Sequence, residues 1–204
     1  MVFIIGIFGK MGSGKSSAAE FLMNDLEGLG KKCHLISMDK IGHSALKEPE
    51  VMNKVKFSFG SDVFSEKFID RKKLGKIVFS DSLKMNKLNS IIHPILYSKI
   101  INEIHLLKSN YDFIIIEGAL LFFLKLNDIC DMTLFIDLEY EKRMKRLLKR
   151  NPDLHAEDIK KRIDIQEKIS FIKKDFSDYY YNNSENLSSL RKFINRLSFM
   201  IVNG

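Results

Sequence analysis

Residues 9–16, GKMGSGKS, fit the phosphate-binding pattern G-x-x-x-x-G-K-[ST]. The glycines let backbone N–H groups turn inward around phosphate oxygens. A helix that begins near Lys15 directs the positive end of its dipole at the same point. In this pattern Lys15 contacts the β- and γ-phosphates and Ser16 binds Mg²⁺, whereas Lys10 is expected to point to solvent. The stretch therefore predicts a binding site for ATP.

Apolar segments of strand length alternate with helical segments on both sides of this loop. Residues 2–8 are rich in β-branched and aromatic side chains and predict a buried strand. Further strands are predicted at 34–38, 112–116, 132–136 and 178–182, and helices at 15–29, 139–150, 156–168 and 187–201. Apolar strands that alternate with helices indicate an α/β fold around a buried parallel sheet.

The segment 41–108 lacks strand character and is too long to be a single crossover. Its apolar residues recur near helical spacing, which predicts several helices, a loop at Gly60 and 68–71, and a helix start or kink at His93-Pro94. We interpret it as an inserted substrate-binding subdomain. Five phenylalanines are expected to be mostly core, with some lining a groove for an apolar part of a substrate: Phe57, Phe59, Phe64, Phe68 and Phe79.

Two carboxylates follow predicted strands, Asp39 after the second and Glu117 after the third. In parallel sheets the site lies at the carboxyl ends of the strands, which places both carboxylates, with Asp137, on the rim that carries the phosphate loop. Asp39 either accepts a proton from a substrate hydroxyl or caps a helix that starts near Ile41. Glu117 either binds Mg²⁺ through water, contacts substrate, or is a cap or turn residue.

Arg143, Arg146 and Arg150 share one helical face, because they lie at positions i, i+3 and i+7. A solvated basic face is the default interpretation of such a run. Phosphoryl transfer, however, needs cations on the developing charge, and this favours a functional role for Arg146 and Arg150. The helix breaks at Asn151-Pro152 and resumes, which is typical of a lid that closes over ATP.

Three residues of the helical segment stand out by type. From its position, His93 is expected to be a packing or capping histidine. Asp70 and Arg71 are interpreted from their spacing as a local ion pair. Taken without further context, these three residues are expected to have structural roles and no catalytic role.

Composition narrows the class of protein. The net charge of +7 fits either Lys-rich helical surfaces or a partner that carries several phosphates. Cys33 and Cys130 are the only cysteines, and they are expected to be buried free thiols; no Cys/His cluster suggests a metal site. Segment 2–8 is too short to span a membrane and lacks the features of a secretory signal, from which we expect a cytoplasmic protein.

The motifs together resemble the dephospho-coenzyme A kinase family over nearly the whole chain. Segment 6–17 is similar to the family's phosphate loop, and 36–39 lies where the family has Ile-Asp-Ala-Asp. The more specific part is a series in matching order and spacing: Phe59-Gly60, Ile69-Asp70-Arg71, Leu74, Val78-Phe79 and Ile92-His93-Pro94. Later matches are Leu120-Leu121, Arg146, Arg150, Arg162 with Gln166, and Asn182-Asn183.

The resemblance implies a three-layer P-loop kinase with a five-stranded parallel sheet. It implies one domain, 1–204, with a core of 1–40 and 109–204, a helical substrate insert at about 41–108 and a helical lid at about 146–168. The implied reaction transfers the γ-phosphoryl group of ATP to the ribose 3′-hydroxyl of dephospho-coenzyme A, the last step of coenzyme A synthesis. ATP and Mg²⁺ are the implied cofactors. Nucleic acid and membrane are not expected as partners, and the protein is expected to be a monomer or a weak homo-oligomer.

The resemblance also assigns residues to roles. The catalytic residues are Asp39 as general base, Lys15 and Arg146. The ATP-binding residues are Gly12, Ser13, Gly14, Lys15, Ser16, Ser17 and Arg150, and Ser16 is also the metal ligand. The substrate-binding residues are Asp39, Arg71, His93 and Glu117.

The chain departs from the family pattern at several positions. Ser37 replaces the first aspartate of Asp-Ala-Asp, Ala119 replaces a proline, Phe123 replaces a glutamate, and Phe176-Ser177 replaces Ala-Asp. Glu117 is a candidate to compensate for the lost acidic group. Three alternatives remain open: a P-loop kinase of nucleosides or nucleoside monophosphates, a nucleotide-dependent switch or nucleic-acid-binding module, and a catalytically weak relative. The chain has no guanine-recognition Asn-Lys-x-Asp motif and no RNA-binding aromatic signature.

Overall fold

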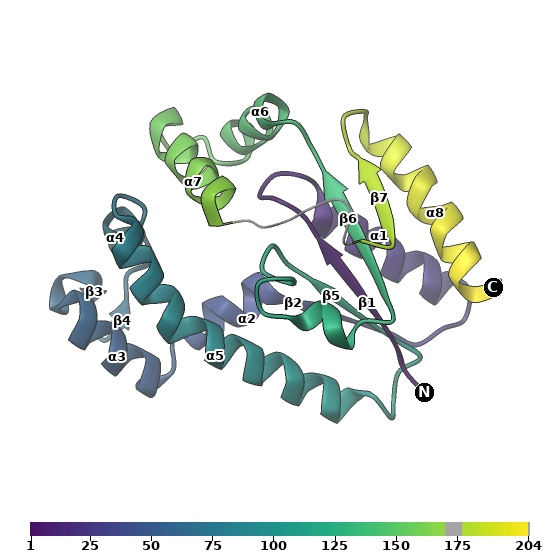
Figure 1. The fold of residues 1–204 in the computed structure, drawn as a ribbon, viewed down its shortest axis with the longest axis horizontal. Coiled ribbons are helices and arrows are strands. Elements are labelled where there is room, and N and C mark those ends of the chain that lie inside the picture. The colour runs from purple at the N-terminus through teal and green to yellow at the C-terminus, as the bar shows by residue number, and fades with distance from the viewer. Residues whose placement is uncertain (170–176, 204) are drawn as a thin grey trace. The chain divides into compact units, whose positions relative to one another are not determined.

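The computed structural model describes residues 1–169 and 177–203. Its main sheet consists of five parallel strands in the order β2-β5-β1-β6-β7 (Figure 1). In that order they are Cys33–Ser37, Phe113–Glu117, Phe3–Phe8, Met132–Asp137 and Tyr179–Asn182. The α/β prediction with a five-stranded parallel sheet is therefore confirmed.

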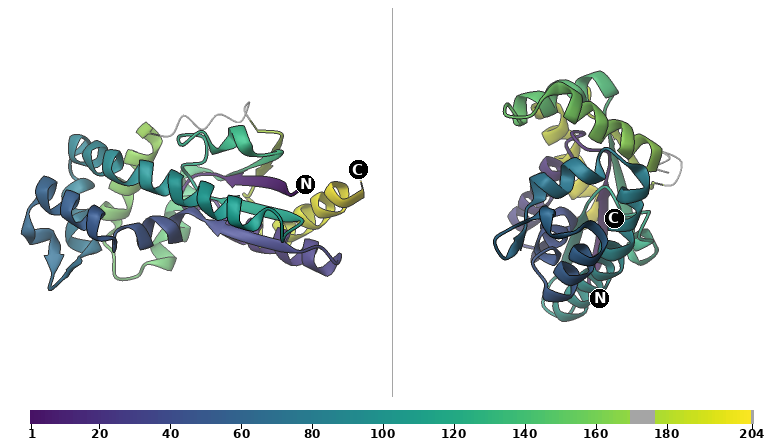
Figure 2. Two further views of the ribbon diagram at one scale, coloured as in Figure 1. Left: turned by 90° about the horizontal axis from the view of Figure 1, so that it is seen from below. Right: turned by 90° about the vertical axis from the view of Figure 1, so that its left-hand side faces the viewer.

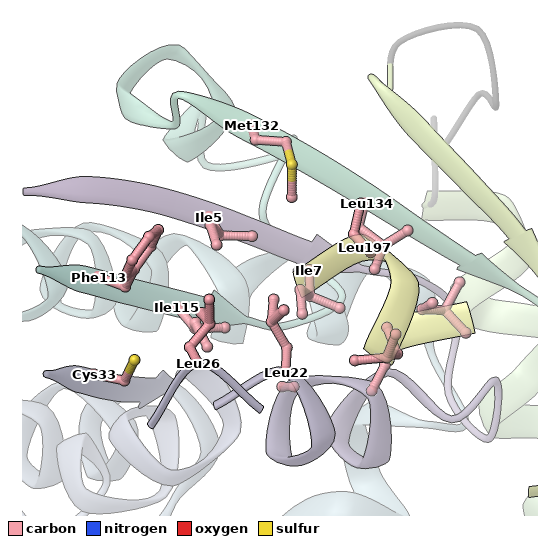
Figure 3. Close-up of a cluster of buried hydrophobic side chains, with 14 of the residues drawn as sticks. Ile5, Ile7, Leu22, Leu26, Cys33, Phe113, Ile115, Met132, Leu134 and Leu197 are labelled. Carbon is pink, nitrogen blue, oxygen red and sulfur yellow. The ribbon is translucent and has the colours of Figure 1, made fainter. Parts of the chain in front are cut away.

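The apolar runs became strands because both faces of the sheet are covered. On one face α1 (Lys15–Gly28) and α8 (Leu187–Asn203) pack against the strands (Figure 3). Ile5 and Ile7 of the central strand β1 are fully buried there. The cluster on this face also contains Ala18, Ala19, Leu22, Leu26, Cys33, Phe113, Ile115, Met132, Leu134, Ile136, Leu190, Ile194 and Leu197.

The segment that follows β5 packs against strand β1. The Phe8 ring lies 4.5 Å from the Phe122 ring and 5.0 Å from the Phe135 ring, measured between centroids. The 3₁₀ helix η2 (Leu126–Ile129) continues this segment. A Cβ atom on Gly6 would lie 2.8 Å from the Leu121 side chain, so the segment approaches the strand closely.

Helices α6 (Tyr140–Arg150) and α7 (Ala156–Ile169) lie beyond the carboxyl end of β6 (Figure 1). Both chain termini lie at the opposite end of the sheet, where β1 begins (Figure 2). The carboxyl edge of the sheet is thus the edge that carries the phosphate loop and the two helices. Within the described residues, no helix is both long enough and apolar enough to cross a membrane.

The chain divides into two compact units, residues 1–37 with 103–204, and residues 38–102. The second unit contains α2 (Met38–Ala45), α3 (Pro49–Phe59), η1 (Ser61–Val63), β3 (Phe64–Ser65), β4 (Phe68–Ile69), α4 (Arg71–Val78) and most of α5 (Ser82–Leu107). The proposed division into core, insert and lid stays a prediction.

Two expectations for the second unit were wrong, and one of two alternatives for His93-Pro94 is excluded. Strands β3 and β4 form a small antiparallel hairpin, which two-residue strands cannot signal by periodicity. Pro94 lies inside α5, which excludes the helix start and leaves the kink as a prediction. The phenylalanine set is not core: Phe57 is 93% exposed and Phe68 is 59% exposed, and the other three are partly exposed.

Candidate active site

The phosphate loop has a backbone that only glycine fits at two positions. Gly9 has φ 157° and Gly14 has φ 103°. A Cβ atom would lie 2.2 Å from the Ile136 carbonyl oxygen at Gly9, and 2.3 Å from Asn183 Nδ2 at Gly14. Side chains at these positions would therefore clash with Ile136 of β6 and with Asn183, which follows β7, so glycine keeps the loop close to the sheet.

Glu117 is the centre of a polar cluster at the carboxyl ends of β2 and β5. Its carboxylate is 3% exposed. Lys15 Nζ lies 3.5 Å from Glu117 Oε1, and Ser16 Oγ donates to the same oxygen at 3.1 Å. Ser37 Oγ donates to Glu117 Oε2 at 3.4 Å. The loop lysine, the loop serine and the serine that departs from the family pattern therefore all meet one carboxylate.

This cluster fits a divalent cation of the Mg²⁺ type by the chemistry of its donors. Ser16 is exposed, and its hydroxyl donates to the buried Glu117 carboxylate, so a hydroxyl oxygen and a carboxylate oxygen lie side by side. Among the described residues no group of three or more His, Cys, Asp or Glu side chains could hold a metal by itself. Such a donor set suits a cation that takes most of its other ligands from phosphate and water.

Arg146 and Asn183 hold the other side of the loop. Arg146 donates to the Ser13 carbonyl oxygen at 3.3 Å and to the Asn183 carbonyl oxygen at 3.0 Å. Asn183 Nδ2 donates to the Ser13 oxygen at 2.7 Å. Burial lowers the pKa of the Arg146 guanidinium, which still stays charged at neutral pH. Arg146 thus lies at the phosphate loop, and Asn183 is a loop contact that the sequence signalled only as part of a motif.

The loop is also tied to α7, which sequence reasoning missed. Met11 N–H donates to Gln166 Oε1 at 2.7 Å, and Lys10 pairs with Glu167. Arg143, 2% exposed, pairs with the same Glu167 carboxylate. The expectation that Lys10 points to solvent was therefore wrong, because a carboxylate on a distant helix reaches it. Only the α7 signature around Gln166 could have drawn attention to this contact.

The remaining predicted residues of this unit lie as follows. Arg150 is exposed at the end of α6, and Ser17 lies in the first turn of α1. Asp137 accepts the Tyr180 hydroxyl at 3.2 Å and the Leu138 N–H at 2.8 Å. Cys33 and Cys130 are free, and burial raises the pKa of each thiol to about 12. The departure at Phe176 lies outside the described residues.

In the second unit, Asp39 and Arg71 come close to one histidine. Asp39 is exposed in the first turn of α2, and His43 follows one turn later. Arg71 Nη2 lies 2.6 Å from His43 Nε2. Because α2 starts at Met38, the structure excludes one of the two alternatives for Asp39, a cap of a helix that starts near Ile41. His43 was missed, although its i+4 spacing from Asp39 was visible.

Two further expectations in this unit can be compared with the structure. Asp70 does not form a local ion pair with Arg71; its carboxylate caps α4 by accepting the N–H groups of Lys72 and Lys73 at 2.9 and 3.1 Å. The backbone bond from Lys73, the bond from the Ser65 hydroxyl and the backbone bond from Lys72 lower the pKa of Asp70. His93 is buried in α5, which lowers the pKa of its imidazole. Its role in substrate binding stays a prediction.

Comparisons with known proteins agree with this geometry. The model of a family described as dephospho-CoA kinase matches residues 3–189. The chain is 34% identical to a dephospho-CoA kinase from Prochlorococcus marinus over 186 residues, which covers 88% of this chain and 83% of that protein.

Solved structures give the same result. A dephospho-CoA kinase from Campylobacter jejuni is similar with a TM-score of 0.60 and 28% identity, and the match covers 98% of both chains. A structure from Thermus thermophilus has a TM-score of 0.72 at 23% identity and covers 100% of this chain and 99% of that one. The second likeness concerns the fold alone.

Proposed function

The chain belongs to the dephospho-CoA kinase family, and from this membership we propose that it transfers the γ-phosphoryl group of ATP to the ribose 3′-hydroxyl of dephospho-coenzyme A. This is the final step of coenzyme A synthesis. The observation that supports the donor half of the reaction is the convergence of Lys15 and Ser16 on Glu117 beside the phosphate loop.

The donor half would hold ATP through the phosphate loop. Backbone N–H groups of residues 12–17 would bind the β- and γ-phosphate oxygens at the N-terminus of α1. Lys15 would leave Glu117 for the γ-phosphate, where its charge offsets that of the transferring group. Arg146, already at the loop, would stabilise the same charge. Arg150 would join it from the end of α6.

Mg²⁺ would be held by Ser16 directly and by Glu117 through water, in keeping with the oxygen donors of this cluster. When bound, the cation neutralises charge on the β- and γ-phosphate oxygens. Ser37 would keep the Glu117 carboxylate oriented, which gives a role to a residue that departs from the family pattern.

The acceptor half would rest on Asp39. Its carboxylate would accept the proton of the 3′-hydroxyl as that oxygen bonds to the γ-phosphorus and the bond to ADP breaks. Arg71 would bind an anionic part of the acceptor, and His93 and Glu117 would contribute further contacts. The exposure of Asp39 and Arg71 in α2 and α4 supports their availability to a substrate.

The test is phosphoryl transfer from Mg-ATP to dephospho-coenzyme A by wild type, Asp39→Asn and the matched control Asp62→Asn. We expect Asp39→Asn to lower kcat by roughly 10²–10⁴-fold, the usual contribution of a general base. Asp62 is also exposed in the second unit, and its variant should behave as wild type.

Two outcomes would contradict the proposal in different ways. Full activity of Asp39→Asn would remove Asp39 from its role and leave the substrate assignment. Faster transfer to a nucleoside or a nucleoside monophosphate than to dephospho-coenzyme A would replace the assignment of the substrate.

A further inference from the structure

One contact in the second unit has no place in the proposed reaction so far. His43 lies one turn after Asp39 on α2, and Arg71 is the first residue of α4. The Arg71 guanidinium lies 2.6 Å from His43 Nε2. The contact joins two helices, and both side chains are otherwise exposed. It therefore fixes where the Arg71 guanidinium points.

The chemistry of the two side chains decides the proton position. Arginine has only N–H donors and stays charged at every physiological pH. His43 Nε2 must then be the acceptor, so the ring is neutral and carries its proton on Nδ1. A protonated ring would present N–H to N–H, and two positive charges would meet at hydrogen-bond distance.

The charged groups that act on the pKa of His43 are Arg71 on α4 and Asp39 on its own helix. Partial removal from water and the Arg71 charge lower the pKa of His43, while Asp39 raises it, and the lowering prevails. The folded-state pKa thus lies below the ordinary value of 6.5. His43 is therefore neutral at pH 7 and gains a proton only on acidification.

We propose that His43 is a positioning residue whose unprotonated Nε2 holds the Arg71 guanidinium in the orientation that binds the acceptor substrate. The proposal rests on the proposed kinase function, because it takes Arg71 as a residue that binds dephospho-coenzyme A, the substrate that accepts the phosphoryl group. A guanidinium recognises phosphate oxygens through a planar pair of donors, so its orientation matters as much as its charge. Protonation of His43 releases Arg71, and acceptor binding weakens with it.

Three variants separate orientation from folding. His43→Gln keeps a hydrogen-bond acceptor for Arg71 at a similar distance and does not titrate, whereas His43→Leu removes this hydrogen-bond acceptor. His105→Gln makes the same change at an exposed histidine of α5. The KM for dephospho-coenzyme A and for ATP, with kcat, is measured from pH 5.5 to 8.5.

We expect the wild-type KM for dephospho-coenzyme A, the acceptor KM, to be constant above pH 6.5 and to rise below it. His43→Leu should raise the acceptor KM roughly three- to tenfold at pH 8, the effect of one hydrogen bond, with the ATP KM unchanged. His43→Gln should restore most of the affinity and lose the acid rise. His105→Gln should keep the wild-type profile.

An acid rise that persists in His43→Gln, or an acceptor KM that His43→Leu leaves unchanged, would overturn the proposal while the function stands. Wild type that transfers nothing to dephospho-coenzyme A would overturn the function and the proposal together. NMR titration of the His43 ring protons gives a reading that needs no substrate. Arg71→Met should raise the His43 pKa, because the arginine lowers it; an unchanged pKa would also overturn the proposal.

Discussion

The two groups of candidate residues differ in how firmly the free protein holds them. Around the phosphate loop, Lys15 is 7% exposed and Glu117 is 3% exposed. Lys15 of α1 pairs with Glu117 of β5, and Ser37 of β2 donates to the same carboxylate. In the second unit Asp39, His43 and Arg71 are exposed, and a single bond of 2.6 Å links Arg71 to His43. The ATP side is preorganised, whereas the acceptor side faces water. Changes on the first should affect stability and activity together, and changes on the second should affect activity alone.

The largest effect should come from Lys15→Met. It removes the charge that faces the transferring group and leaves the buried Glu117 without its cation. We expect kcat/KM for ATP to fall by roughly 10²–10³-fold, as when one transition-state donor is lost. Steady-state kinetics measures the loss, with Lys145→Met, an exposed lysine of α6, as the control. Near-normal activity would show that Lys15 does not contact the phosphates.

A smaller effect is expected from Glu117→Gln. The amide keeps a hydrogen-bond acceptor for Ser16 or Ser37 but removes the negative charge beside the metal site. We expect a roughly 10- to 100-fold loss of activity, with more Mg²⁺ needed for half-maximal rate. Measuring the rate over a range of Mg²⁺ concentrations tests both effects. The control is Glu20→Gln, a change at an exposed glutamate. An unchanged Mg²⁺ requirement would remove Glu117 from the metal site.

The smallest effects concern stability and compare two arginines. Arg143→Met takes a buried guanidinium from Glu167, and we expect the free energy of unfolding to fall by about 2–4 kcal/mol. Arg71→Met changes an exposed side chain and should alter it by less than about 0.5 kcal/mol. Denaturant unfolding of both variants gives the comparison. Equal losses would mean that the two regions do not differ in the way proposed here.

Sequence reasoning found the features that repeat locally. The strands were visible as apolar runs, and the loop was visible because Gly9, Gly14 and Lys15 must be those residue types. It also found the rim on which Glu117 lies, because the carboxyl ends of parallel strands meet there. Such features depend on the spacing of residues along the chain, which can be read directly from the sequence.

The sequence did not reveal contacts between distant segments. Lys10 meets Glu167 and Met11 meets Gln166 across more than 150 positions, and no local pattern encodes such a pairing. The alternative in which Asp39 caps a helix near Ile41 placed the start of α2 too late, because helix starts are the least certain feature of a sequence pattern. The phenylalanines of the second unit look like core residues by type, yet Phe57 faces water.

The bond from Asn183 to the Ser13 carbonyl oxygen has a consequence for the order in which the protein is made. Ser13 leaves the ribosome before its partner, which lies 170 positions later in the chain. A nascent chain therefore carries the complete phosphate-binding motif long before it carries the group that supports it. Chains that stop before residue 183 keep the motif but lack this hydrogen bond, so the phosphate loop gains its full support only after Asn183 has been made.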